Sequence, residues 1–298
     1  MSYKVLVFVK QVPDTQNISG DAMTPEGTVN RAALPAIFNP EDLNALELAL
    51  QLKDRYGAHI TVATMGMPAA AEVLRQSLYR GADRCVLVTD RALAGADTLA
   101  TSYTLSCCAK TLGDFDVILC GRQAIDGDTA QVGPQIAEKL KIPQICYVEE
   151  VRSLDDKKIV CRRAIEGGYE VLESPTPVLL TVIDANDPRP ANVKRIMKYK
   201  RAKTPGEVTA ARANADPADA GTIDAELGAL RKSGLLIDEL NAAGVNADPS
   251  RIGFTGSPTK VKQVQSVVLT AGEANSVEPT ASGISELIHE LIIDHTLG

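Results

Sequence analysis

Apolar and polar positions follow two alternating patterns over the first 145 residues. Short runs rich in β-branched residues predict strands. The segments between them repeat apolar residues every three or four positions, which predicts helices at about 40–55, 68–79 and 96–112. The predicted strands are YKVLVFV (3–9), HITVATM (59–65), CVLVTD (85–90) and DVILC (116–120). This alternation favours an α/β fold with a parallel-core sheet and helices on both faces.

The first predicted helix carries a start signal. The stretch NPED (39–42) offers an asparagine for the N-cap, a proline for the first helical position and two acids for the first turn. Leu43, Leu46 and Leu50 then fall on one helical face, so we expect this face to pack on the sheet.

The pattern changes after residue 144. Four further strands are predicted, joined by tight turns at 155–156 and 167–168 that favour antiparallel additions to the sheet. Their sequences are QICYVEEVRSL, KKIVCRRAI, YEVLES and PVLLTVID. Residues 204–222, rich in Ala, Asp, Gly and Pro, have the composition of a linker.

Two helices are predicted in the last third of the chain. The first spans about 224–243. The second, at 284–297, is amphipathic, with Ile284, Leu287 and Ile288 on one side. This tail helix either closes the chain's own core or docks on a partner.

Composition narrows the function classes. The chain has 298 residues, 45% of them apolar and 23% charged, and a net charge of −7, which does not indicate nucleic acid or an anionic membrane as a partner. No run of eighteen apolar residues occurs, so no membrane span is expected. The six cysteines form no Cys-x-x-Cys pair, which favours reduced thiols in a cytoplasmic protein.

The turn at the start of GRQAIDGDTAQVGPQIAEKL (121–140) is the strongest candidate for a ligand site. It follows a predicted strand and opens a predicted helix, where α/β folds bind ligands and where backbone N–H groups favour anions. Gly121 and Gly127 permit close backbone approach or positive φ. Asp128 and Gln131 have the spacing of a capping box. We expect Thr129, Gln131 and nearby N–H groups to bind a phosphate.

Other interpretations of this turn stay open. A capped helix start without a ligand would give the same residues. The turn is neither a Gly-Lys-Ser/Thr phosphate loop nor a Gly-x-Gly-x-x-Gly fingerprint. Asp126 and Asp128 favour turn and capping roles over an acid–base pair. The three histidines are scattered, which argues against a catalytic triad or metal cluster.

Several motifs in order resemble the beta subunit of electron transfer flavoproteins, the FixA-like family. They are VLVFVKQVPD, FNPEDLNALE, TMGMPAAAEVLRQSLYRGADR, GRQAIDGDTAQVGPQIAE, RAIEGGYEVLESPTPVLLTVIDANDPRPANVKRIMKYKRA and GSPTKV. The resemblance runs from end to end. It implies a fold similar to adenine nucleotide alpha hydrolases and universal stress proteins. It also implies residues 1–203 as a nucleotide-binding α/β domain, and residues 204–298 as a linker and C-terminal arm contacting an alpha subunit.

The resemblance also implies a set of cofactor-binding residues, among which Arg122, Asp126, Thr129 and Gln131 are expected to hold the cofactor directly. No side chain is expected to act as an acid or base of its own, so the subunit would be redox-active only within a flavoprotein complex. The implied set is Phe8, Val9, Lys10, Asn39, Asp42, Met65, Gly66, Gly121, Arg122, Gln123, Ala124, Ile125, Asp126, Gly127, Asp128, Thr129, Ala130, Gln131 and Val132.

Two family types differ in what fills this pocket. The motif DGDTAQVG (126–133) is similar to the electron-bifurcating type, which holds FAD that takes electrons from NADH and passes them to ferredoxin or flavodoxin and to the alpha-subunit FAD. Compared with an acidic residue at this position, the glycine at 127 leaves more space and removes one negative charge near a diphosphate. The alternative is an AMP-binding structural subunit of a one-FAD electron shuttle. A stand-alone adenine-nucleotide sensor is a third hypothesis.

The basic stretch at about 186–203 matches the family's partner-recognition loop. The resemblance implies docking on a flavin dehydrogenase, for acyl-CoA, lactate or a related substrate, through Val193, Lys194, Arg195, Ile196, Met197 and Lys198. A solvated basic helix is the alternative interpretation. A nucleic-acid patch is disfavoured, because the total charge is acidic and the stretch holds a single aromatic residue.

Overall fold

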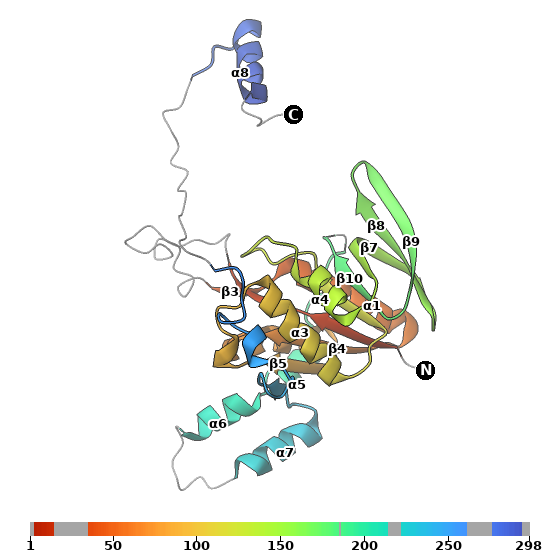
Figure 1. Ribbon diagram of the computed structural model, residues 1–298. Coiled ribbons are helices and arrows are strands. Elements are labelled where there is room, and N and C mark those ends of the chain that lie inside the picture. Colours follow the sequence, from red (N-terminus) through yellow and green to blue (C-terminus); the bar gives the residue numbers. More distant parts are fainter. Residues whose placement is uncertain (1–2, 15–34, 185, 214–221, 261–275, 294–298) are drawn as a thin grey trace.

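The protein is described by a computed structural model covering residues 3–14, 35–184, 186–213, 222–260 and 276–293. Within these residues one sheet of nine strands forms the centre of the molecule, in the order β11-β5-β4-β1-β6-β10-β7-β8-β9 (Figure 1). Neighbours from β11 to β7 are parallel, and β7, β8 and β9 are antiparallel to one another. The predicted α/β fold class, a parallel-core sheet with antiparallel additions, is confirmed.

The strands span β1 (Lys4–Phe8), β4 (His59–Met65), β5 (Arg84–Val88), β6 (Val117–Gly121), β7 (Gln144–Leu154), β8 (Lys158–Ile165), β9 (Gly168–Pro175), β10 (Val178–Val182) and β11 (Asp238–Leu240). A separate antiparallel pair is formed by β2 (Gln11–Pro13) and β3 (Ala36–Phe38). The helices are α1 (Pro40–Tyr56), α2 (Ala71–Arg80), α3 (Thr98–Leu112), α4 (Val132–Leu140), α5 (Val193–Tyr199), α6 (Pro205–Ala213), α7 (Ile223–Ser233) and α8 (Ala281–Ile293). Short 3-10 turns span Pro68–Ala70, Arg91–Leu93 and Pro249–Arg251.

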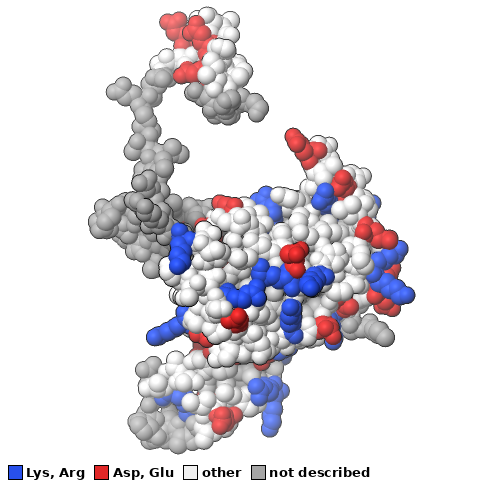
Figure 2. All heavy atoms as spheres, viewed as in Figure 1, with Lys and Arg blue, Asp and Glu red and all other residues white. Residues whose placement is uncertain are grey.

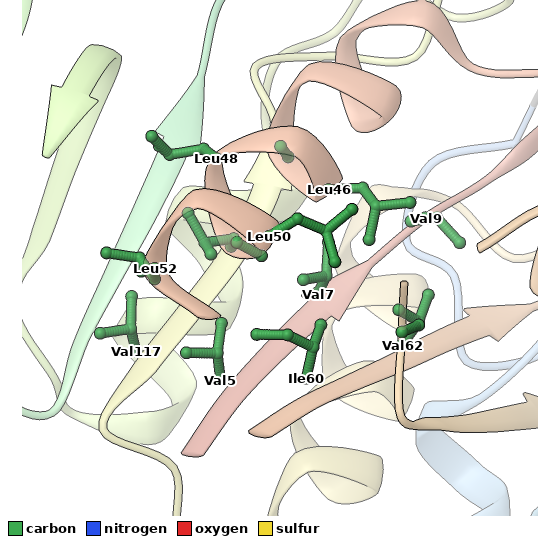
Figure 3. Packing of buried hydrophobic residues seen from close by; sticks show 14 of the residues in the cluster. Val5, Val7, Val9, Leu46, Leu48, Leu50, Leu52, Ile60, Val62 and Val117 are labelled. Atoms are coloured by element: carbon green, nitrogen blue, oxygen red, sulfur yellow. The ribbon is translucent and has the colours of Figure 1, made fainter. Parts of the chain in front are cut away.

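Alternate residues of β1 face two separate hydrophobic cores. Val5 and Val7 pack with α1 and α2 on one face of the sheet, while Leu6 and Phe8 pack with α3 and α4 on the other. Figure 3 shows the first core, with leucines of α1 lying over Ile60 and over valines of β1, β4 and β6. Because side chains alternate along a strand, a continuous apolar run supplies both cores at once.

The strand PVLLTVID was expected to be an antiparallel addition to the sheet, but it is a central strand. As β10 it lies between β6 and β7 and is parallel to both. All five of its residues are buried. Its unbroken apolar run is typical of a parallel strand covered on both faces, and this outweighs its place among antiparallel strands in the sequence.

The region after residue 203 differs from the expected linker and long helix. Residues 205–213 form α6, and 214–221 lie outside the described residues. The helix expected at 224–243 ends as α7 at Ser233, because Gly234 takes a left-handed conformation. Strand β11 then joins the main sheet beside β5. A domain division at 203 stays a prediction.

The expected tail helix is present as α8, and residues 294–297 lie outside the described part. Its residues Ile284, Leu287, Ile288 and Ile292 are exposed. No helix in the described ranges has the length and apolar character needed to cross a bilayer. All six cysteines are free thiols.

Candidate functional site

A cavity of about 380 Å³ lies at the carboxyl ends of β1, β4 and β6 and beside the segment that follows β5, within the size range of small-molecule sites. Its apolar part is formed by Phe8, Val9, Met65, Leu93 and Leu105. Its polar rim is the loop between β6 and α4 together with the start of α3. The cavity therefore occupies the edge where ligands of open α/β sheets bind.

The buried carboxylate of Asp42 joins two walls of this cavity. Its Oδ2 accepts the N–H of Lys10, just after β1, at 2.9 Å, and its Oδ1 accepts the N–H of Gly121, the last residue of β6, at 2.9 Å. Burial raises the pKa of Asp42 to about 7, although these bonds and Asn39 act in the opposite direction. The first turn of α1 thus fixes the relative position of two strand ends.

Glu41 and Asn39 hold the next residues of the loop. Glu41 accepts the guanidinium of Arg122 at 2.7 Å and the N–H of Gln123 at 3.0 Å. The Asn39 side chain donates to the carbonyl of Gln123 at 2.8 Å and accepts the N–H of Ile125 at 3.2 Å. Polar residues at the start of α1 therefore determine the path of the loop.

Asn39 stands at the N-cap position of α1 as expected, but its side chain makes no capping bond. The predicted capping box of Asp128 and Gln131 is wrong. Gln131 precedes α4 without a side-chain cap and accepts Thr98 Oγ1 at 2.8 Å, while Asp128 accepts the Gln123 side chain at 2.9 Å. Backbone groups of Gln123 and Ile125 take the place of the capping bond at Asn39, and the Thr98 hydroxyl takes it at Gln131.

The last residues of the loop have an anion-binding backbone geometry. Asp128 and Ala130 take left-handed φ values of 47° and 52°, and Gln131 follows in the right-handed region. Successive residues of opposite hand turn their N–H groups toward one concave side, and α4 begins directly afterwards. Within the described part of the chain, the N–H groups of Thr129, Ala130 and Gln131 have no acceptor.

Most of the predicted cofactor-binding residues line the cavity. These are Phe8, Val9, Lys10, Asp42, Met65, Gly121, Arg122, Gln123, Ala124, Gly127, Asp128, Thr129, Ala130, Gln131 and Val132. Asn39, Gly66, Ile125 and Asp126 do not line it. Asp126 instead pairs with Lys10 at 2.7 Å, and Gly66 donates its N–H to Val88. Whether these residues bind a cofactor stays a prediction.

The sequence analysis missed one wall of the cavity. The start of α3 and the loop before it contribute Leu93, Gly95, Ala96, Asp97, Thr98, Thr101 and Leu105; Cys120, Gly133 and Ile136 complete the lining. Asp97 caps α3 by accepting the N–H of Ala100 at 2.9 Å. An Asp-Thr pair after a predicted strand was the available signal, because parallel strands all end at the same edge.

The predicted docking residues form the short helix α5, which is capped by Asn192. Val193 and Met197, one turn apart, are 73% and 57% exposed, and Lys194 and Lys198 are exposed beside them. Ile196 is half-buried. Arg195 differs from the rest, because its guanidinium donates to the carbonyls of Leu78 and Ala82 at 2.6 Å. Figure 2 shows basic and acidic side chains interspersed over the visible face.

Fold and site together define an α/β protein with a cavity at the carboxyl edge of a parallel sheet. Residues 26–219 match the family model of the electron transfer flavoprotein domain. The chain belongs to the electron transfer flavoprotein family, among its beta-subunit and FixA-like members.

Three relatives illustrate the similarity. The electron transfer flavoprotein subunit beta of Clostridium acetobutylicum is 45% identical over 87% of this chain and 86% of its own length. The caffeyl-CoA reductase-Etf complex subunit CarD of Acetobacterium woodii is 50% identical over 65% of this chain and 74% of its own. Protein FixA of Bradyrhizobium diazoefficiens is 39% identical over 97% of this chain and 91% of its own.

Proposed function

We propose that this chain binds FAD in the cavity and acts as the beta subunit of an electron-bifurcating electron transfer flavoprotein. The observation that carries the proposal is the set of N–H groups at 129–131, without an acceptor in the described part of the chain, in residues that line a cavity with an apolar end. A phosphate would accept from these donors and from the start of α4. The adenine ring would lie against Phe8, Val9 and Met65, which form the apolar end.

FAD is favoured over AMP by the shape of the rim. A Cβ added at Gly127 would meet no atom within 4 Å, so the rim is open at this residue, which would leave room for the larger of the two nucleotides. The name of CarD, a subunit of a reductase–Etf complex, supports a role beside a reductase. When bound, FAD would supply two-electron chemistry with NADH and one-electron chemistry with ferredoxin or flavodoxin and the alpha-subunit flavin.

The chain's own residues bind and orient the cofactor in this proposal. Asp42, Glu41 and Asn39 hold the loop that carries the phosphate donors, and the Lys10–Asp126 pair fastens the same loop from β1. Preorganised N–H donors cost little reorganisation when the anion arrives. Asp128 is placed on the exposed rim, where it can contact a ligand hydroxyl.

Partner contacts are proposed at two places. Val193 and Met197 form an exposed apolar pair framed by lysines, which fits an apolar pocket with an acidic rim on a flavin dehydrogenase. The exposed apolar residues of α8 fit an alpha subunit as the covering partner. Because Arg195 is bonded to main-chain carbonyls in the last turn of α2 and just after it, the orientation of α5 is defined before docking.

The nucleotide content of the purified complex with its alpha subunit tests the proposal. Acid release followed by chromatography should give two FAD and no AMP per heterodimer. One FAD with one AMP would assign this chain the structural role of the one-FAD shuttle. A complex in which the only nucleotide is the alpha-subunit FAD would refute nucleotide binding by this chain.

A further inference from the structure

A segment late in the chain, residues 252–259, packs against the cavity wall that leads into α3, and it is named the clasp. None of its residues lines the cavity. Ile252 is buried in the same hydrophobic core as Leu93, which belongs to the wall. The N–H of Phe254 donates to the carbonyl of Ala94 at 2.9 Å. The clasp therefore holds the wall through residues that lie about 160 positions later in the sequence.

The strongest contacts of the clasp are made with Asp97. The buried hydroxyl of Ser257 accepts the N–H of Asp97 at 2.8 Å and donates to the carbonyl of Gly253 at 2.7 Å. One carboxylate oxygen of Asp97 caps α3, and the other accepts the N–H of Thr259 at 3.0 Å. Burial acts to raise the pKa of Asp97, but the N–H groups of Ala100 and Thr259 hold it below its usual value. An ionised carboxylate thus joins the start of α3 to the clasp.

The start of α3 also contacts the loop that carries the N–H donors. Thr98 Oγ1 donates to Gln131 Oε1 at 2.8 Å, and Ser102 Oγ donates to Gln135 Oε1 at 2.8 Å. Gln131 is one of the three residues whose N–H groups have no acceptor in the described part of the chain. The start of α3 therefore lies between the clasp and the donor loop, so a shift of this helix end would move both the wall and Gln131.

We propose that the clasp positions the cavity for its ligand, with Ser257 as a positioning residue that acts through Asp97. The inference rests on the proposed nucleotide function, but it involves no contact between the clasp and the nucleotide. With the clasp in place, the wall and Gln131 are ordered before the ligand arrives, and binding does not have to order them. Without it, the ordering of the start of α3 subtracts from the binding free energy.

Calorimetric titration of the full-length chain with AMP tests the proposal on two variants outside the cavity. Ser257→Ala removes the acceptor of the Asp97 N–H, and AMP binding should weaken roughly five- to thirtyfold. Gly253 has a φ of 58°, and a Cβ there would collide with the carbonyl of Ala92, so Gly253→Ala should displace the clasp and weaken binding at least as much. FAD binding should weaken by the same factor, because both nucleotides would use the same wall and donors.

Hydrogen exchange separates positioning from a general loss of stability. The N–H groups of Ala100 and Thr101 are bonded to Asp97, so they should exchange faster in Ser257→Ala, and saturating AMP should restore their protection. Exchange within α1 should stay at the wild-type rate. The matched control is Ser250→Ala, which removes an exposed hydroxyl bonded to Asp248 within its own turn and should change neither exchange nor affinity.

Three results would overturn the proposal. The first is wild-type AMP affinity in both clasp variants while the start of α3 exchanges faster, because the wall would then move without consequence for the ligand. The second is faster exchange in α1 as well as α3 together with a lower melting temperature, which would reduce the clasp to a support of the whole fold. The third is a wild-type chain that binds neither AMP nor FAD, which would refute the proposed function and the role of the clasp with it.

Discussion

Two glycines of the loop after β6 should respond in opposite ways to the same substitution. A Cβ added at Gly121 would lie 2.6 Å from the carbonyl carbon of Glu41 and 2.7 Å from the backbone nitrogen of Asp42. The nearest contact is about 0.8 Å short of an ordinary van der Waals contact, which begins near 3.4 Å. Both neighbours are backbone atoms of α1, which cannot change rotamer to avoid the new Cβ. The end of β6 and the start of α1 must therefore move apart.

The cost of Gly121→Ala has two parts. Overpacking of this kind costs about 1–3 kcal/mol. Separation also stretches the bond from Gly121 N–H to Asp42, whose loss adds about 1–2 kcal/mol. The free energy of unfolding should therefore fall by about 2–5 kcal/mol, which corresponds to a melting temperature lower by roughly 5–15 °C.

Gly127→Ala is the matched control in the same loop. A Cβ there meets nothing within 4 Å, and Gly127 is not among the residues with positive φ. The variant should be as stable as the wild type or more stable by about 0.4–1 kcal/mol, because alanine restricts the unfolded chain. Urea unfolding measures the free energies, and AMP titration should show weaker binding for Gly121→Ala only. Equal stability of the two variants would refute the assignment of α1 as the clamp of this loop.

Three further predictions follow from single contacts. Burial raises the pKa of Asp42 to about 7, so the protonated form is favoured in the fold, and its stabilising contribution is complete below pH 4 and is lost as the pH rises to about 7. The free energy of unfolding should decline over this window by up to about 1.4 kcal/mol per pH unit. Urea unfolding of Asp42→Asn should show a flatter dependence of stability on pH. Glu47→Gln leaves the guanidinium of Arg189 without its partly buried carboxylate, and chemical denaturation should show a loss of about 2 kcal/mol; an unchanged midpoint would contradict this. Val193→Glu and Met197→Glu should slow electron transfer to the dehydrogenase in a stopped-flow assay at an unchanged melting temperature, since both side chains are exposed; wild-type rates would exclude α5 from docking.

Periodicity was sufficient to predict elements that carry a clear local apolar pattern. The α-helices and the main-sheet strands up to β6 were predicted within a few residues, because local apolar patterns record which faces are buried, whereas the short strands β2 and β3 were not predicted. β10 was harder to place, since the residues that it pairs with in β6 and β7 lie 61 and 34–35 positions upstream in the sequence. Pairing over such separations leaves no local signal beyond a continuous apolar run.

The site shows the same division residue by residue. The sequence by itself indicated a ligand loop at 121–132 and acids at the start of α1, because glycines, caps and strand ends have local signatures. Only the tertiary structure turned Asp42 and Glu41 from helix-capping acids into clamps of that loop, and it alone brought in the wall at Asp97 and Thr98. A carboxylate bonds to whichever donor lies within 3 Å of it, and that donor is selected by the packing of segments some eighty residues apart.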